Sequence, residues 1–335
     1  MAGSSAEAVV AADGVRKNFG QTPALAGLDL RVPEARVCGM LGPNGAGKTT
    51  AVRIFATLLR PDAGRARVAG YDVVREPAEV RARIGLAGQH AAIDEKLSGR
   101  DNLRIFGRLY HLSERASRQR ADELLERLGL AQAGSRLAET YSGGMRRRLD
   151  LIASLITAPP VLFLDEPTAG LDPGSRSEIW SSIRQLAAEG TTVLLTTQYL
   201  DEADHLADQI VIVDQGRVTA SGAPGQLKSA IGSRLDVVVH DAADLPLAAA
   251  VLARIPSASP PELALERRLA SVALRGGTLT LAEVVRELDG SGVVVDDVAL
   301  RQPTLDEVFL RLTGAGAEQT SPQGGVGVAR PVSSR

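Results

Sequence analysis

Apolar and polar positions predict strands at the start of the chain, followed by a glycine-rich turn and a helix. Positions 28–32 alternate, and 36–41 is an apolar strand that runs into the turn. Residues 8–40 are therefore predicted to form short strands. A helix is predicted to follow from about Lys48 to Leu59, and Pro61 stops it.

The segment 95–158 is predicted to be mostly helical. Leu124, Leu125 and Leu128 form an apolar stripe at helical spacing, and Gly129 ends that helix. A helix-rich insert therefore separates the first strands of the chain from those that follow.

Strands and helices alternate along the first two thirds of the chain. Positions 161–164 and 192–196 have the composition of strands buried on both faces of a sheet, and a β-hairpin is predicted around 214–216. The alternation favours an α/β fold with a mainly parallel sheet covered by helices, N-terminal antiparallel strands and the helical insert.

The character of the chain changes after about Lys228. Between residues 235 and 300, strand, helix, strand, strand, helix and strand patterns follow one another, which suggests a small ferredoxin-like α+β domain. A last helix is predicted to begin at Thr304, which has capping-box spacing to Glu307. Residues 315–335 are rich in Gly, Ser and Pro and are predicted to form a disordered tail.

Composition and charge exclude several classes of protein. With 44% hydrophobic residues among 335, the chain can bury a core, and its net charge of -2 gives no basis for nucleic-acid binding. Cys38 is the only cysteine, so no intrachain disulfide is possible. No signal peptide is visible, and no uncharged apolar run approaches the ~20 residues that span a bilayer. If the protein works on a membrane, another chain supplies the membrane part.

The segment GPNGAGKTT at 42–50 matches G-x-x-x-x-G-K-[ST] between a predicted strand and a predicted helix. Its glycines let backbone N–H groups turn toward phosphate oxygens, and the helix N-terminus adds partial positive charge. Lys48 is predicted to reach the β- and γ-phosphates of ATP, and Thr49 to ligate Mg²⁺. The predicted ATP-binding residues of this P-loop are Gly42, Pro43, Asn44, Gly45, Ala46, Gly47, Lys48, Thr49 and Thr50.

The segment VLFLDEP at 161–167 is an apolar strand that ends in two carboxylates. Asp165 is expected to hold Mg²⁺ through water, and Glu166 to orient and polarise the attacking water. Many strands end in acidic loops for structural reasons. The P-loop in the same chain favours the hydrolytic interpretation.

A second helix begins at glycines within YSGGMRRRLDLIASLI. Ser142 is a good N-cap, and an N-terminus with Gly143 and Gly144 is an anion site in a chain that already has one phosphate cradle. The alternative is an ordinary capped helix, which the position of the segment just before the acidic strand disfavours. Arg146 can pair with Asp150 at i,i+4, so a solvated basic face is expected here.

These motifs, in this order, resemble the ATP-binding cassette family. In that family the serine-glycine signature of one subunit closes over the γ-phosphate that is held by the P-loop of its partner. The resemblance implies a P-loop NTPase cassette that acts as a homodimer. It also implies that the residues in contact with the partner's ATP are Ser142, Gly143, Gly144 and Met145.

The resemblance assigns roles to three further residues. Phe19 stands where an aromatic residue stacks on adenine, with a core position as the alternative. Gln89 matches the glutamine that senses Mg²⁺ and the attacking water. Asp172, in GLDP, matches the loop that couples the two sites, a role compatible with capping a helix. The four histidines show no metal-ligand spacing, so no metal beyond the ATP-bound Mg²⁺ is expected.

Gln198 departs from the commonest family pattern, which has a histidine after the strand. Glutamine can donate one hydrogen bond to the γ-phosphate, but it cannot become positively charged near neutral pH. We therefore expect Gln198 to take part in catalysis by positioning the γ-phosphate without titrating. Over about residues 8–314, TTQYLDEAD, YSGGMRRRLD and TLDEVFLRLTG look like the daunorubicin/doxorubicin-resistance ATP-binding proteins of actinobacteria.

This second resemblance implies a peripheral ATPase at the cytoplasmic face of the cell membrane. With ATP and Mg²⁺ it would drive efflux of a hydrophobic, anthracycline-like drug through a separate permease. The expected parts are a nucleotide-binding domain at 1–228 with its helical subdomain at about 95–158, a C-terminal accessory and assembly domain at 229–314, and a tail at 315–335.

Two alternatives remain. Export of a lipid, peptide or polysaccharide stays open, because the permease selects the cargo. A cassette that acts on ribosomes or DNA is disfavoured, since the chain has neither a second cassette nor a long coiled coil. No nucleic-acid partner is expected.

Overall fold

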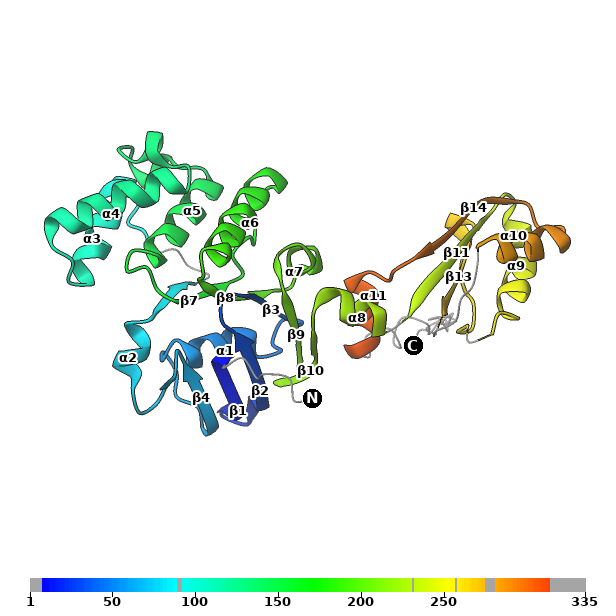
Figure 1. The fold of residues 1–335 in the computed structure, drawn as a ribbon, viewed down its shortest axis with the longest axis horizontal. Helices are drawn as coiled ribbons and strands as arrows, with labels where there is room; N and C mark the ends of the chain where they lie inside the picture. The colour runs from blue at the N-terminus through cyan, green and yellow to red at the C-terminus, as the bar shows by residue number, and fades with distance from the viewer. Residues whose placement is uncertain (1–7, 89–91, 231, 257, 275–280, 314–335) are drawn as a thin grey trace, which may run out of the picture.

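A computed structural model of the chain describes residues 8–88, 92–230, 232–256, 258–274 and 281–313. Gln89 and the predicted tail at 315–335 lie outside these residues. The chain forms a large N-terminal lobe and a smaller C-terminal lobe (Figure 1).

The strands of the N-terminal lobe are β1 (Ala8–Phe19), β2 (Thr22–Pro33), β3 (Val37–Leu41), β4 (Ala63–Val68), β5 (Tyr71–Asp72), β6 (Ile84–Ala87), β7 (Val161–Asp165), β8 (Thr192–Thr197), β9 (Gln209–Asp214) and β10 (Arg217–Gly222). Its helices are α1 (Lys48–Phe55), α2 (Pro77–Arg81), α3 (Gly99–Leu109), α4 (Glu114–Arg127), α5 (Gly143–Ser154), α6 (Pro173–Ala188), α7 (Leu200–Leu206) and α8 (Pro224–Ala230). Short 3-10 helices lie at Ala131–Ala133 and Ala138–Thr140.

The central sheet has six strands in the order β10-β9-β3-β8-β7-β6. The strands from β9 to β6 are parallel, and β10 forms the predicted hairpin with β9. Strands β3, β7 and β8 are buried along their whole length, because both faces of the sheet are covered. Phe163 packs in one core cluster with α1, whereas Leu162 packs in another with α4 and α5. The predicted mainly parallel sheet is confirmed.

A second, antiparallel sheet has the order β2-β1-β4-β5. Strands β1 and β2 have 12 residues each, so the prediction of short strands was wrong in length. The register of the β1–β2 pair shifts between Ala12 and Val15 and again at Arg16. Such bulges interrupt the alternation of inward and outward side chains and make one strand resemble two.

Helix α1 ends at Phe55, four residues before the predicted end. Thr57 adopts a left-handed φ of 63°, and the N–H of Leu58 donates to the carbonyl of Arg53 at 2.8 Å. This tight closure satisfies a terminal carbonyl of the helix without help from Pro61. The helical insert agrees with its prediction: Leu124 and Leu125 are fully buried, and Gly129, with φ 72°, follows the end of α4.

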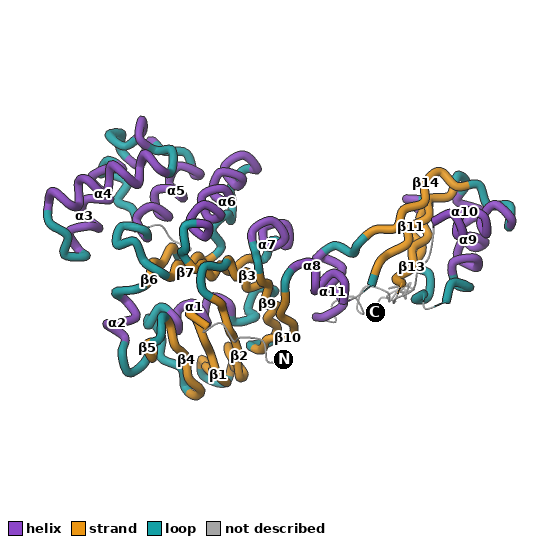
Figure 2. Tube along the Cα trace, viewed as in Figure 1, coloured by secondary structure: helices purple, strands orange, loops and turns teal. Residues whose placement is uncertain are grey.

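The C-terminal lobe contains β11 (Ser233–Val239), α9 (Leu245–Leu252), β12 (Glu262–Ala264), β13 (Leu269–Leu274), α10 (Leu281–Gly290) and β14 (Val295–Arg301), with short 3-10 helices at Ala242–Asp244 and Leu265–Arg267. The sheet is antiparallel in the order β12-β13-β11-β14. Helices α9 and α10 lie on one face of it (Figure 2) and share a core cluster with β11 and β13. This is the predicted ferredoxin-like arrangement.

The last helix, α11 (Leu305–Thr313), returns to the N-terminal lobe. Its predicted capping box is confirmed: the N–H of Thr304 donates to Glu307 Oε2 at 2.9 Å, and the N–H of Glu307 donates to Thr304 Oγ1 at 3.3 Å. Leu305 and Val308 are buried in a cluster with Leu41 and Ile210 of the N-terminal lobe. The apolar face of α11 therefore packs with the N-terminal lobe, although the predicted boundary at 228 places it in the accessory domain.

Arg301 joins α11 to the sheet of the C-terminal lobe. It donates two hydrogen bonds of 2.9 Å to Glu307 and one of 2.5 Å to Asp236. Hydrogen bonding by Arg301 lowers the pKa of Glu307 below its usual 4.5. A lowered carboxylate pKa contributes stability that is present above the unfolded pKa and is lost as the pH falls through the folded pKa.

We therefore expect the thermal midpoint of the chain to fall upon acidification below pH 4.5, and to fall less in Glu307→Gln. Glutamine keeps the capping-box geometry but does not titrate. Calorimetry of both proteins between neutral and acidic pH measures the difference. Identical pH dependence in the two proteins would show that the Arg301–Glu307 pair does not stabilise the fold.

Candidate active site

The P-loop lies between the end of β3 and the start of α1, with neighbouring strands directly against its backbone. Gly47 has φ 104°, and a Cβ at this position would lie 2.4 Å from the carbonyl oxygen of Ala24 in β2. A Cβ at Gly42 would lie 2.3 Å from the carbonyl oxygen of Val213 in β9. Both positions therefore require glycine for close backbone approach, and Gly47 requires it also for its left-handed turn.

Lys48 is buried at the first position of α1. Its Nζ donates to the carbonyls of Gly42 and Pro43 at 2.7 and 3.0 Å. Burial lowers the pKa of Lys48, while the nearby carboxylates of Glu166 and Asp165 raise it in part. The ammonium group thus lies folded into the loop, where phosphate oxygens are the natural replacement for its carbonyl partners.

Asp165, at the end of β7, lies beside the first turn of α1. Its Oδ1 accepts hydrogen bonds from Thr49 Oγ1 at 3.1 Å and from Thr196 Oγ1 at 2.5 Å. Hydroxyl and carboxylate oxygens are the ligands that Mg²⁺ prefers. Within the described ranges no group of three or more His, Cys, Asp or Glu could hold a metal ion, so an ion here would draw its other ligands from a nucleotide and water. The residues fit Mg²⁺ that arrives with a nucleotide.

Glu166 follows Asp165 and turns the chain away from the sheet. Its φ of 51° is in the left-handed region, where a non-glycine residue costs about 1–3 kcal/mol. Its N–H donates to the carbonyl of Thr196 at 3.1 Å, and its side chain is half-buried. The Glu166 carboxylate lies close enough to Lys48 for its charge to raise the pKa of that lysine.

The signature segment opens α5 with two glycines in different environments. Ser142 caps the helix, its Oγ accepting from the N–H of Met145 at 3.2 Å, and Ser142 and Gly143 are exposed. Gly144 is buried, and a Cβ there would lie 2.4 Å from Ser175 Oγ at the start of α6. Gly144 therefore also serves helix packing, a role that the motif did not reveal.

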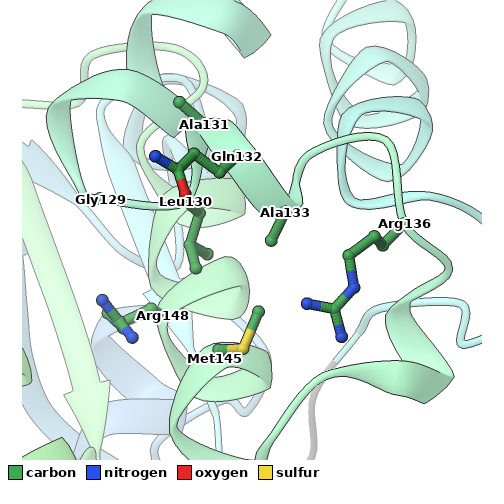
Figure 3. A pocket seen from close by; sticks show the side chains of 8 residues that line it. All are labelled: Gly129, Leu130, Ala131, Gln132, Ala133, Arg136, Met145 and Arg148. Carbon is green, nitrogen blue, oxygen red and sulfur yellow. The ribbon is translucent and has the colours of Figure 1, made fainter.

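A cavity of about 520 Å³ lies beside the signature helix (Figure 3). Its lining residues are Gly129, Leu130, Ala131, Gln132, Ala133, Arg136, Met145 and Arg148. Figure 3 shows Met145 between the guanidinium groups of Arg136 and Arg148. Arg136 donates to the carbonyl of Thr140 at 2.9 Å, and Arg148 pairs with Glu178 at 2.9 Å. Protein partners therefore hold both cationic groups at this cavity in place.

The P-loop and the signature segment lie on opposite faces of the central sheet. Helix α1, which begins with the P-loop lysine, packs in one core cluster, and α5 packs in the other. Figure 1 shows the two helices on either side of β7 and β8. The structure thus brings together Lys48, Thr49 and Asp165. Glu166 lies near them, because its charge raises the pKa of Lys48.

Three other predicted site residues lie at element ends. Phe19 is 53% exposed at the end of β1, so the alternative of a core position is wrong. Gln198 is exposed between β8 and α7. Asp172 caps α6, its Oδ1 accepting from the N–H of Ser175 at 3.0 Å. Gln89 lies outside the described residues, so its placement stays a prediction.

The predicted ion pair between Arg146 and Asp150 is wrong. Arg146 lies 3.6 Å from Glu95, whereas the buried Asp150 lies 3.6 Å from Arg147. Arg147 is itself mostly buried, so the basic run does not form a wholly solvated face. On α5, Arg147 and Asp150 are three residues apart and share the side that faces the end of β7.

Glu202 is a buried acid that the sequence did not single out. Its Oε1 accepts from Thr168 Oγ1 at 2.8 Å and from Trp180 Nε1 at 3.1 Å. It lies on α7, four residues after Gln198, and Thr168 follows Glu166 by two residues. Glu202 therefore connects the segment that carries Gln198 to the turn that carries Glu166.

No helix of the described ranges combines the length and apolar character needed to cross a bilayer. Residues 25–169 match the family model described as ABC transporter. The chain is 57% identical to the daunorubicin resistance ATP-binding protein DrrA3 of Streptomyces coeruleorubidus, over 92% of this chain and 97% of that protein. It is 50% identical to the daunorubicin/doxorubicin resistance ATP-binding protein DrrA of Streptomyces peucetius, over 92% and 94%. Among solved structures, the ADP conformation of an ABC transporter cassette is similar, with a TM-score of 0.60 and 27% identity over 65% of this chain and 92% of that one.

Proposed function

The chain belongs to the family of ABC transporter ATP-binding proteins and is an ATPase, and we propose that it acts as a homodimer at a separate membrane permease. The observation that carries the dimer is the placement of the P-loop and the signature on opposite faces of one sheet. Two phosphate-binding elements so arranged suit two nucleotides, each held between the P-loop of one copy and the signature of the other.

In this dimer each nucleotide has residues from both copies around it. The P-loop residues, Lys48 above all, bind the β- and γ-phosphates of one ATP. Ser142, Gly143, Gly144 and Met145 of the other copy cover the same γ-phosphate with helix N–H groups. Phe19 stacks on adenine, and Asp172 lies where the two copies meet. Mg²⁺ bound with ATP would be held by Thr49 and Asp165, with Gln89 nearby, and would offset the charge of the phosphates.

Glu166 is the proposed catalytic carboxylate. It orients a water molecule for in-line attack on the γ-phosphate and accepts a proton from it. Hydrolysis removes the γ-phosphate, and with it the contacts across the dimer, so the two copies separate. This opening and closing is a two-state change that the permease can use.

The proposed cargo is an anthracycline-like drug, and the proposed location is the cytoplasmic face of the membrane. Support comes from the names of the relatives, which are resistance proteins for daunorubicin and doxorubicin. The test is doxorubicin uptake into inverted vesicles that contain this chain and its permease. ATP-dependent uptake that Glu166→Gln abolishes is expected. Uptake of a lipid, peptide or polysaccharide in place of the drug would assign another cargo.

Gln198 leads to a prediction about pH. Gln198→Ala is expected to lower kcat, because a hydrogen bond to the γ-phosphate is lost. Gln198→His is expected to retain activity and to add a titration near the histidine pKa of about 6.5, which the glutamine enzyme lacks. The pH profiles of kcat for the three proteins measure this. Unchanged turnover in Gln198→Ala would exclude the residue from catalysis.

A further inference from the structure

Arg147, on the signature helix α5, forms an unusual set of hydrogen bonds with the chain at the ends of β6 and β7. Its side chain is 14% exposed, and its guanidinium group donates to four backbone carbonyls. Nε donates to Pro167 at 2.8 Å, Nη1 to Gly88 at 2.7 Å, and Nη2 to Asp165 and Glu166 at 3.0 and 2.9 Å. We call these five residues the Arg147 cluster.

The bonds of the Arg147 cluster fix the backbone at Glu166. The carbonyl of Asp165 belongs to the peptide unit before the Glu166 Cα, and the carbonyl of Glu166 to the unit after it. When Arg147 holds both oxygens, it restrains both backbone dihedrals of Glu166. The left-handed φ of 51° is costly for glutamate, so it needs such external support.

The charge of Arg147 is only partly compensated where it lies. Asp150, 5% exposed, is 3.6 Å away, and its Oδ1 accepts from the N–H of Ala92 at 3.1 Å. Burial lowers the pKa of Arg147, and the carboxylates of Asp150, Asp165, Glu202 and Glu166 raise it in part. A planar guanidinium can satisfy several carbonyls in fixed directions, whereas the lysine ammonium is a point charge with three rotatable donors. The site therefore favours arginine.

Arg147 lies on α5, whose exposed N-terminus is the signature. Ser142, Gly143 and Arg147 are within two helical turns of one another, so a displacement of the signature moves Arg147 as well. The carbonyl of Gly88 adds the end of β6 to the same cluster.

We propose that Arg147 is a positioning residue for hydrolysis, which holds Glu166 in its catalytic orientation and couples that orientation to the signature helix. The proposal rests on the function proposed above for Glu166. Arg147 itself contacts neither nucleotide nor water in this role, because its hydrogen bonds go to four backbone carbonyls and its ion-pair partner is Asp150.

The test uses the full chain and the variants Arg147→Lys and Arg147→Gln. Loss of the guanidinium group is expected to lower kcat by about tenfold to a hundredfold, the size of effect seen when a catalytic group is misplaced by about 1 Å. The Kd for a fluorescent ATP analogue should stay close to that of the unchanged protein. The thermal midpoint should fall while the fold persists, because the costly turn at Glu166 and the buried Asp150 lose a partner. Arg147→Lys should keep more activity than Arg147→Gln, because it retains some donors.

A second arm places each Arg147 variant in the Glu166→Gln background. If Arg147 acts through Glu166, the double variant should turn over ATP no more slowly than Glu166→Gln alone. Losses that multiply would overturn the proposal. So would a parallel loss of folding, ATP binding and turnover in both single variants, since that marks a structural residue. Normal hydrolysis by Glu166→Gln would instead refute the proposed role of Glu166.

Arg120 provides the matched control. It is an arginine of the same helical insert, its side chain is 20% exposed, and it donates to the carbonyl of Leu155 at 3.1 Å. It has no bond to the residues around Glu166 in this structure. Arg120→Lys is expected to leave kcat unchanged, and a drop equal to that of Arg147→Lys would contradict a specific role for the Arg147 cluster.

Discussion

Glu166→Gln is expected to lower kcat by about 10²–10⁴-fold, which is the usual contribution of a general base. Glutamine has nearly the shape of glutamate, so the turn at φ 51° and the ATP site should persist. It lacks the negative charge that polarises the attacking water. ATP binding should therefore survive while hydrolysis fails.

The same variant should accumulate closed dimers, because the γ-phosphate that holds the two copies together is no longer removed. Size-exclusion chromatography with and without ATP, together with single-turnover hydrolysis, measures both effects. Glu126→Gln on α4 is a suitable control, since it removes one carboxylate charge by the same exchange at an exposed position of the helical insert. A Glu166→Gln protein that hydrolyses ATP normally would show that another group activates the water.

The second large effect concerns the composite site itself. Lys48→Ala removes the ammonium group from the P-loop, and Ser142→Arg blocks the signature of the same chain. Each variant alone should have almost no activity, because every site in its homodimer is damaged. In a mixed dimer both defects fall in one site, and the other site keeps an intact P-loop and an intact signature.

Mixing the two inactive proteins should therefore restore hydrolysis, to about a quarter of the normal rate if the chains pair at random and the sites act independently. The assay is steady-state phosphate release at a series of mixing ratios, with a maximum expected at equal amounts. A mixture of Lys48→Ala with the double variant Lys48→Ala/Ser142→Arg is the negative control. Absence of any recovery, with mixed dimers detected, would contradict a site shared between copies.

The sequence predicted most of the chemistry, because the catalytic motifs are local. A P-loop needs glycines, a lysine and a threonine at fixed spacing, and 42–50 supplies them within one turn of chain. The strand before Asp165 and the capping box at Thr304 are equally short-range patterns, and the structure has both. The ferredoxin-like order also followed from successive local patterns.

Other features depend on which distant segments come together. The lengths of β1 and β2 were hidden by bulges, and α1 ended early because Thr57 closes it. Gly144 is enclosed by Ser175, 31 positions later in the chain. No spacing rule in the sequence reports such contacts.

The sequence by itself determined that this chain has a P-loop motif and a second helix that opens on glycines, and it predicts that both bind phosphate. Only the tertiary structure decided that these lie on opposite faces of one sheet, that α11 completes the N-terminal lobe, and that Arg147 holds the turn at Glu166. The physical reason is how far along the chain the partner of each group lies. Phosphate is recognised by consecutive N–H groups, which are encoded locally, whereas the guanidinium of Arg147 is satisfied by carbonyls that only the folded chain brings within reach.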